Sequence, residues 1–392
     1  MTNSIKILGK KIFILPILIF IFCLLIYYFT SPGKTPYDHF SRLATSFLNG
    51  KYYITYSDSW LSELIPAGYS KFYVAYPPMS AILLTPLILI FKESFQQQYL
   101  AYLLGAAVVF LTYNLSLKIV KDKKIAVWST ILVNFGTIIW FLSSVGSSWY
   151  LAQVVSFFFL MAALNESLGK KRSLLVGIFL GASYLSRLTT ILSFPFFLYL
   201  VKGKKIYKNF ILFGLGILPF ILFNFSYNFV RFGTIFDKGY ILIPGVLEEI
   251  WYQKGLFNPT YIPRHLKVIF TSLPIFQKEF PYIIPSWMGL SIWITTPAFI
   301  YSLFSNIKER IIQISWLVIA LISLVIFSHG TVGFTQFGYR FAVDFYPFLI
   351  FLTIKGVSKG KLKWHHYLLL AISILVNFWG VMFINKFSWV RY

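Results

Sequence analysis

Long apolar segments recur along the chain, separated by shorter polar ones. A helix of roughly twenty apolar residues can cross the hydrocarbon core of a bilayer. The pattern predicts about eleven such spans, and hence an all-α polytopic membrane protein with a single domain over residues 1–392. The predicted spans are 12–30, 96–117, 125–142, 149–168, 173–186, 188–201, 209–229, 288–305, 311–328, 341–355 and 365–385. The adjacent pair 173–186 and 188–201 is short and requires tilt or a locally thinner bilayer.

Residues 77–91, with the sequence PPMSAILLTPLILIF, form an apolar segment that is short for a crossing and begins with two prolines. We predict a re-entrant or interfacial helix here instead of a span. The charge pattern supports this choice, because a full crossing would invert every later loop. The lysines of residues 118–124 would then face outward.

Lysine and arginine are concentrated in short loops on one side of the predicted spans. Such a bias marks the cytoplasmic side, so the N-terminus is predicted to be cytoplasmic. More than half of the 35 lysine and arginine residues fall in these inner loops. The inner segments are 6–11, 118–124, 170–172, 202–208, 308–310 and 355–363.

The carboxylates gather on the opposite, outer side. Two long outer loops are predicted there: 31–94, with amphipathic juxtamembrane helices, and 230–287, a possible acceptor side. Asp344 lies just inside the outer edge of its span. The outer acids are Asp38, Asp58, Glu63, Glu93, Asp237, Glu248, Glu249 and Glu279. Chemistry that needs carboxylates is therefore expected on the extracytoplasmic face of the cell membrane.

Composition agrees with a membrane protein. Hydrophobic residues make up 58% of the chain and charged residues only 12%, whereas soluble domains have nearer 25% charged residues. The formal net charge is +23, but no basic, weakly hydrophobic block of the kind that binds nucleic acid is present in the sequence. Lys6, Lys10 and Lys11 precede the first apolar run as in a signal peptide, and the length of that run predicts an uncleaved anchor. The single cysteine, Cys23, excludes an intrachain disulfide.

The stretch after the first span, KTPYDHFSRLATSFLNG, predicts an amphipathic helix on the outer membrane surface. Thr35 fits the N-cap and Pro36 the first helical position, and Asn49-Gly50 ends the helix. Its apolar stripe consists of Phe40, Leu43, Ala44, Phe47 and Leu48. Asp38 at its start has two interpretations that spacing does not separate. It is either a carboxylate paired with Arg42 one turn later, or a general base at the water–lipid boundary.

The segment SDSWLSEL predicts a second outer helix. Asp58 and Glu63 would be cap and surface residues of this helix, or one of them would act as a second acid.

The sequences PYDHFSRLATSFLNGKYYI and KFYVAYPPMSAILLTPLILIF resemble the first outer loop of the C-type glycosyltransferase superfamily. This superfamily includes protein O-mannosyltransferases, aminoarabinose transferases that act on lipid A, and bacterial enzymes that use polyprenyl-phosphate mannose. The resemblance covers the layout of spans to about residue 230 and is weaker beyond.

The resemblance implies that Asp38 is the catalytic base. His39 stands where the second acid of the family's pair is expected, so a divalent metal is possible but not favoured, and no other cofactor is implied. The implied donor is a polyprenyl-phosphate sugar, with mannose favoured. The acceptor would be a lipid, a polysaccharide or a protein, and nucleic acid is not expected.

Transfer from a lipid phosphate also needs cations that stabilise the departing phosphate. Arg187, in SYLSRLTT, and Arg340, in QFGYRFAVDFYP, lie at the outer ends of predicted spans. The alternatives are that Arg187 snorkels outward and that Arg340 pairs with Asp344 one turn below. Lys71, before the segment 77–91, could reach a phosphate or be a solvated loop lysine. His39 and Arg42 would support the base.

The sequence therefore predicts an inverting membrane glycosyltransferase that acts on the outer face. A transporter or flippase of lipid-linked sugars is the main alternative, although the middles of the spans carry almost no charge. A non-catalytic subunit that gathers anionic lipid is a second alternative, but it leaves the outer acids unexplained. None of the common nucleotide-binding glycine motifs occurs in the sequence.

Overall fold

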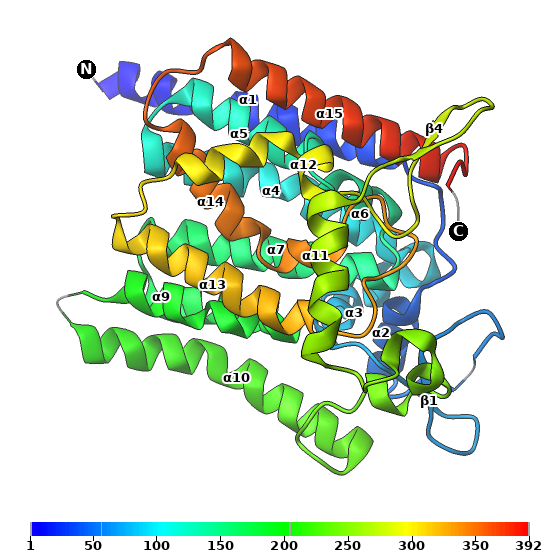
Figure 1. Cartoon of the computed structure of the whole chain (residues 1–392). Coiled ribbons are helices and arrows are strands. Elements are labelled where there is room, and N and C mark those ends of the chain that lie inside the picture. The colour runs from blue at the N-terminus through cyan, green and yellow to red at the C-terminus, as the bar shows by residue number, and fades with distance from the viewer. Residues whose placement is uncertain (1, 56, 204, 391–392) are drawn as a thin grey trace.

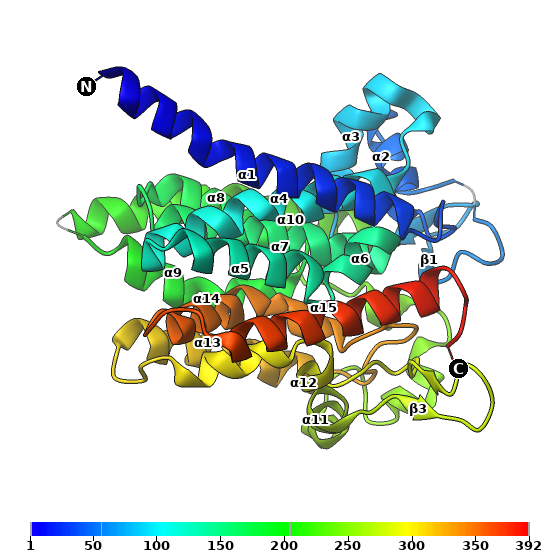
Figure 2. The ribbon, with the colours of Figure 1, turned by 90° about the horizontal axis from the view of Figure 1, so that it is seen from above.

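The computed structural model describes residues 2–55, 57–203 and 205–390, and it is mostly helical. Long helices lie side by side in one bundle, with most of the irregular structure at the end opposite the N-terminus (Figure 1). The helices that form the bundle are α1 (Thr2–Phe29), α4 (Gln97–Val120), α5 (Lys123–Phe135), α6 (Ile139–Val145), α7 (Ser148–Ser167), α8 (Ser173–Tyr184), α9 (Phe194–Val201), α10 (Ile206–Phe232), α13 (Arg310–Phe327), α14 (Tyr346–Val357) and α15 (Trp364–Asn385). Seen from above, α1 and α15 lie on the near side of the bundle, and α2 and α3 stand out from its side (Figure 2).

Five helices of the described chain are long and apolar enough to cross a membrane: α4, α7, α10, α13 and α15. A sixth span results if α5 and α6, which meet at 49°, are taken together. The prediction of about eleven spans is therefore not confirmed. Shorter apolar helices occupy Ile14–Phe29, Met79–Phe91, Ser173–Tyr184, Leu188–Val201 and Tyr346–Val357.

The predicted span 288–305 is wrong as a continuous helix. It contains only the four-residue α12 (Ile292–Thr295) and the 3₁₀ segment Pro297–Phe304. Pro297 has no backbone N–H and interrupts the hydrogen-bond ladder. This segment packs closely against α14, where a Cβ at Gly356 would lie 1.8 Å from the carbonyl oxygen of Tyr301.

Glycines allow α8 and α10 to touch through their backbones. A Cβ at Gly177 would lie 2.2 Å from the carbonyl oxygen of Phe213, and one at Gly216 would lie 2.3 Å from that of Leu174. Close approach at small residues is the usual means of helix association in membranes, where apolar side chains gain little by leaving lipid.

The lysine-rich connections meet at one end of the bundle. The ammonium group of Lys355 lies 2.6 Å from Glu309, and Lys118 donates to the carbonyl oxygen of Asn165 at 2.6 Å. The side chains of Lys6, Lys10 and Lys11 lie outside the described residues. Which end faces the cytoplasm stays a prediction from the charge pattern.

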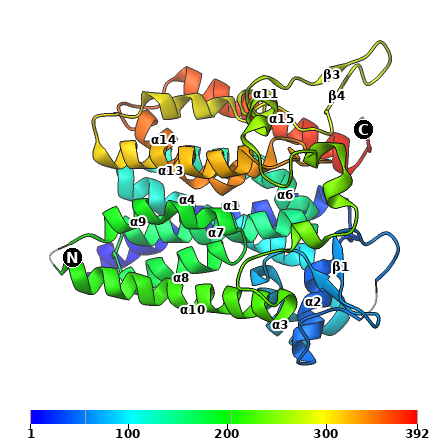
Figure 3. The ribbon, with the colours of Figure 1, turned by 60° about the horizontal axis from the view of Figure 1, so that its bottom comes forward.

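Both long loops lie at the other end, which we call the outer end (Figure 3). The first loop carries α2 (His39–Leu48), the antiparallel strands β1 (Leu64–Pro66) and β2 (Phe72–Val74), and α3 (Met79–Phe91). The second carries α11 (Ile262–Thr271) and the antiparallel strands β3 (Ile275–Phe276) and β4 (Ile283–Ile284). Further 3₁₀ segments of the chain are Lys92–Ser94, Leu188–Ser193, Tyr240–Leu242, Val246–Glu248, Ile250–Tyr252, Pro259–Tyr261 and Arg340–Asp344.

The predicted amphipathic helix is present, but its start is not where the sequence placed it. Asp38, not Thr35, occupies the N-cap, and its side chain makes no capping hydrogen bond. The hydroxyl of Thr35 instead accepts from the backbone N–H of Tyr37 at 3.2 Å. The stripe is buried at Phe40, Leu43 and Ala44, where α2 packs on α3.

The predicted second outer helix is wrong. Asp58 lies in an irregular segment, and Glu63 immediately precedes β1. Glu63 has a φ of +61°, a left-handed conformation that excludes a regular helix at this residue. Leu64 is paired with Val74 across the two-stranded sheet.

Candidate functional site

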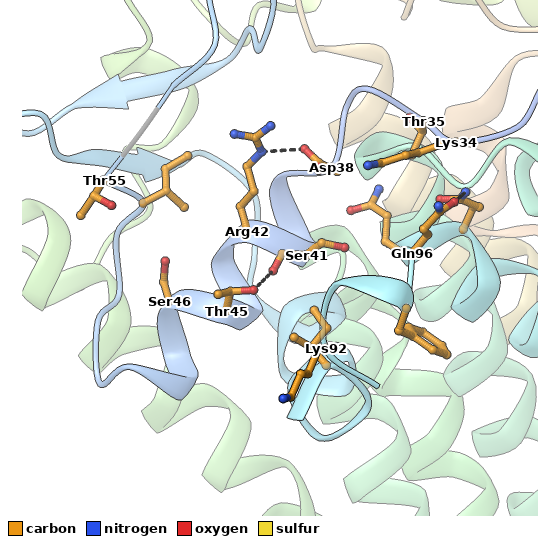
Figure 4. A pocket seen from close by; sticks show the side chains of 15 residues that line it. Lys34, Thr35, Asp38, Ser41, Arg42, Thr45, Ser46, Thr55, Lys92 and Gln96 are labelled. Atoms are coloured by element: carbon orange, nitrogen blue, oxygen red, sulfur yellow. Dashed lines mark hydrogen bonds and ion pairs between the residues drawn. The ribbon is translucent and has the colours of Figure 1, made fainter. Parts of the chain in front are cut away.

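A polar cavity of about 510 Å³ at the outer end has Asp38 in its wall (Figure 4). The ammonium-bearing side chains of Lys34 and Lys92 also line it, and neither lysine forms an ion pair among the described residues. Uncharged polar side chains complete much of its surface: Thr35, Ser41, Thr45, Ser46, Thr55, Gln96, Gln97 and Gln98. We refer to it as the first cavity.

Asp38 belongs to a small ionic cluster on this wall. The Nε atom of Arg42 lies 2.7 Å from Asp38, and its Nη2 atom lies 2.7 Å from Asp58. The three side chains are about a quarter exposed. The pairing of Asp38 with Arg42 is thus present, and no contact in the described chain tests whether Asp38 also acts as a base.

His39 faces away from the first cavity and is fully buried. Its Nε2 atom is 2.7 Å from the carbonyl oxygen of Ser62, and its Nδ1 atom is 3.1 Å from the hydroxyl of Ser148. Burial lowers the pKa of His39 and favours the neutral ring. His39 therefore ties α2 to the segment before β1 and to the start of α7.

A second cavity, of about 300 Å³, lies where the two outer loops meet the bundle. Its walls are largely apolar, with Leu188, Ile241, Leu256, Phe257, Val325, Ile326 and Phe341. The polar lining residues are Ser186, Arg187, Thr189, Lys238, Tyr76, Tyr240, His329 and one carboxylate, Asp237. Burial lowers the pKa of His329 to about 4, so this ring is neutral at physiological pH.

Arg187 is held in place by Asp344. Its Nε and Nη2 atoms donate to the carboxylate at 3.1 and 3.0 Å, and the hydroxyl of Thr189 donates to the same carboxylate at 2.6 Å. Burial acts to lower the pKa of Arg187, but Asp344 holds that pKa above its usual value. The alternative in which Asp344 pairs with Arg340 is therefore wrong, because Asp344 lies on the 3₁₀ segment Arg340–Asp344 with its carboxylate toward Arg187.

Arg340 is a buried cation without a carboxylate partner among the described residues. It is 9% exposed, and its Nε atom is buried without a hydrogen-bond acceptor. The guanidinium lies over the rings of Phe341 and Tyr150, at 5.0 and 5.6 Å from their centroids. A buried guanidinium in such surroundings is costly unless an anion binds there.

Lys71 lies in the turn between β1 and β2 and lines neither cavity. Its ammonium nitrogen is 4.9 Å from the centroid of the Tyr53 ring. The structure thus places it at the edge of the first loop, away from the other predicted site residues.

Glu63, which the sequence marks only as a possible second acid, is a centre of hydrogen bonding. Its Oε2 atom accepts from Trp149 Nε1 at 2.8 Å, from the Tyr240 hydroxyl at 3.2 Å and from the Tyr76 hydroxyl. Tyr76 and Tyr240 both line the second cavity. The sequence alone carries no signal for this role, because the positive φ of Glu63 is visible only in the structure.

The structure therefore divides the predicted site residues into two groups. Asp38 and Arg42 line the first cavity, and Arg187 lines the second with Asp344 behind it. The two cavities share no lining residue. His39 lies between the groups, with its ring 5.4 Å from the ring of Tyr76. Asp38 and Arg187 are thus not brought together in one cavity.

No three histidine, cysteine, aspartate or glutamate side chains converge as a metal site in the described ranges. Asp38 and Asp58 approach one another only through Arg42, whose guanidinium occupies the space between the two carboxylates.

Comparison with protein-family models and with curated protein sequences gives no match. Among solved structures, the chain is similar to the oligosaccharyltransferase of Archaeoglobus fulgidus in its apo form, with a TM-score of 0.53 and 12% sequence identity. The alignment covers 94% of this chain and 55% of that protein, so the chain spans about half its length. The likeness shows that this chain shares the fold of that part of the protein, and the apolar helices of the described chain agree with a multi-pass membrane protein.

Proposed function

We propose that this chain is a membrane glycosyltransferase that moves a hexose, with mannose favoured, from a polyprenyl phosphate to an acceptor on the outer face of the cell membrane. The observation that carries the proposal is the second cavity, whose lining combines apolar side chains with the fixed guanidinium of Arg187. Such a cavity suits a ligand with an isoprenoid tail and a phosphate. The fold shared with an oligosaccharyltransferase supports the reaction class.

Arg187, which lines the second cavity, is the proposed phosphate ligand, and Arg340, which lines neither cavity, is the proposed second cation. As the bond between the sugar carbon and the phosphate oxygen breaks, negative charge grows on the departing phosphate, and a guanidinium can stabilise it through paired N–H groups. Asp344 orients Arg187 through two of its nitrogen atoms. Arg340 brings a charge that no described carboxylate neutralises.

The assignment of the base to Asp38 rests on the resemblance of the first outer loop and stays a prediction. Arg42 supports the position of Asp38 through an ion pair. His39, the next residue, supports it by fixing the start of α2 through its hydrogen bond to the carbonyl oxygen of Ser62. A base at Asp38 would serve a substrate held in the first cavity, where Lys34 and Lys92 are the available cations.

The proposal is tested with the purified protein in liposomes and a polyprenyl-phosphate hexose labelled in the sugar. A glycosyltransferase releases polyprenyl phosphate and places the label in a new glycoside when outer-face extracts supply the acceptor. A flippase moves the labelled lipid between leaflets and leaves the sugar–phosphate bond intact. A panel of hexose donors then identifies the sugar, and Arg187→Lys, which keeps the charge but not the paired N–H groups, should lower transfer.

A further inference from the structure

Glu63 collects hydrogen bonds from three separate parts of the chain. Trp149 comes from the start of α7, Tyr76 from the segment before α3, and Tyr240 from the second outer loop. All three donate to the same carboxylate oxygen, Oε2. The carboxylate thereby joins the second outer loop to the first beside the second cavity.

These bonds decide what the two tyrosines can offer to a ligand. A phenolic hydroxyl has one proton, and in Tyr76 and Tyr240 that proton is directed at Glu63. Burial, with the nearby Glu63 carboxylate, raises the pKa of both hydroxyls well above the usual value, so both stay protonated. Their oxygen atoms can then accept a hydrogen bond from a ligand hydroxyl in the second cavity, which both residues line.

Tyr240 is also close to the proposed phosphate ligand. It is among the groups that act on the pKa of Arg187, and both residues line the second cavity. A substrate hydroxyl bound at the oxygen of Tyr240 would therefore lie near a phosphate bound at Arg187. Asp38 has no such position, because it lines the other cavity.

Resting on the function proposed above, we propose that Glu63 is the proton acceptor of the reaction and that Tyr240 relays the proton to it. The acceptor oxygen attacks the anomeric carbon of the sugar as its proton passes to the oxygen of Tyr240. The proton of Tyr240 moves at the same time to Glu63. The bond between the anomeric carbon and the phosphate oxygen breaks, and its electron pair leaves on the phosphate beside Arg187. Glu63 later returns the proton to water.

The backbone of Glu63 has a φ of +61°, a conformation that glycine adopts readily. The titratable groups that interact electrostatically with the carboxylate are His39, Tyr76, Tyr240, Tyr252 and Glu249.

The test compares Glu63→Gln with Tyr240→Phe, Tyr76→Phe and, as a matched control, Glu248→Gln, which changes an exposed acid of the second outer loop. Polyprenyl-phosphate mannose is the donor probe, with binding and transfer measured separately in the full-length protein in liposomes. Glu63→Gln and Tyr240→Phe should bind the donor within about threefold of wild type, yet lower transfer about 100-fold or more. Tyr76→Phe should have the smaller effect, and Glu248→Gln none.

Chemical rescue separates proton transfer from a purely structural role. Glu63→Gly suits the backbone and leaves room for a small carboxylate, so formate should restore part of the lost transfer in this variant and not in Tyr240→Phe. Transfer at the wild-type rate in Glu63→Gln, or no rescue of Glu63→Gly when the donor still binds, overturns the assignment to Glu63. If the wild-type protein itself forms no glycoside with any donor, the proposed function fails instead.

Discussion

The guanidinium of Arg187 binds both oxygens of Asp344, through Nε at 3.1 Å and Nη2 at 3.0 Å, across 157 residues of sequence. Asp344 has no exposed side-chain surface, whereas about a quarter of Arg187 is exposed. The pair therefore has a buried anchor and an accessible end. A guanidinium fixed in this way presents its remaining N–H groups in a defined direction, as recognition of a phosphate requires.

Asp344→Asn should destabilise the protein by roughly 3–5 kcal/mol, because it leaves a largely buried guanidinium without its counter-charge. Thermal unfolding in detergent measures the effect. The double variant Asp344→Asn with Arg187→Gln should recover much of the stability and none of the transfer, since the unpaired charge is gone and the phosphate ligand with it. Equal unfolding temperatures for wild type and Asp344→Asn would contradict a structural role for the pair.

Arg340→Gln should weaken donor binding without destabilising the protein. Removing a buried cation that has no described carboxylate partner leaves no orphaned acid, so stability should stay the same or rise. The KM for the polyprenyl-phosphate donor should rise roughly tenfold to a hundredfold, the amount expected for one or two charge-assisted hydrogen bonds. Arg340→Lys keeps the charge, so its KM for the donor should fall between those of wild type and Arg340→Gln. An unchanged KM in Arg340→Gln excludes Arg340 from phosphate binding.

Several features of the fold were predictable because they depend on local pattern. The apolar stripe of Phe40, Leu43 and Ala44 has helical spacing, and it is buried in α2. Lysine-rich connections between apolar segments predicted a shared end of the bundle, and Lys355 and Glu309 meet there. The fold shared with the Archaeoglobus fulgidus oligosaccharyltransferase agrees with the predicted bundle of apolar helices.

Other features depend on contacts between distant segments, which spacing does not report. Asp344 lies four residues after Arg340, the spacing of an intrahelical pair, but the segment is 3₁₀ and the acid turns to Arg187. Glu63 has an unremarkable sequence context, and its importance follows from Trp149 and Tyr240, far along the chain. The continuous span at 288–305 was wrong because apolar content alone does not distinguish a continuous helix from a broken one.

Acid should destabilise the outer loops through His265. Burial lowers the pKa of this histidine to about 4, and its ring bonds to the hydroxyl of Tyr339 at 2.6 Å and the carbonyl oxygen of His329 at 2.8 Å. The unfolded histidine titrates near 6.5. Between these pH values the unfolded state holds more protons, so the free energy of unfolding rises with pH and is lost on acidification.

The expected loss from His265 is on the order of 3 kcal/mol between pH 6.5 and 4. His329 has a similarly lowered pKa and adds to the slope in the same direction. Unfolding measured across this range should show a smaller pH slope in His265→Gln than in wild type, although the variant is less stable at pH 7.5. A slope that does not change would mean that His265 has the same pKa in the folded and unfolded protein.

Asp38→Asn decides between the two carboxylates. Arg42 keeps Asp58 as a partner in this variant, and the cluster is partly exposed, so stability should change by less than about 1 kcal/mol. With the proton acceptor at Glu63, transfer by Asp38→Asn should stay within about tenfold of wild type, because Asp38 lines a cavity separate from that of Arg187.

Asp58→Asn is the matched control, since it removes the other carboxylate that pairs with Arg42. A loss of more than about 100-fold in Asp38→Asn, with Asp58→Asn active and both proteins folded, would return the base to Asp38. The phosphate ligands would then be Lys34 and Lys92, which share the first cavity with Asp38.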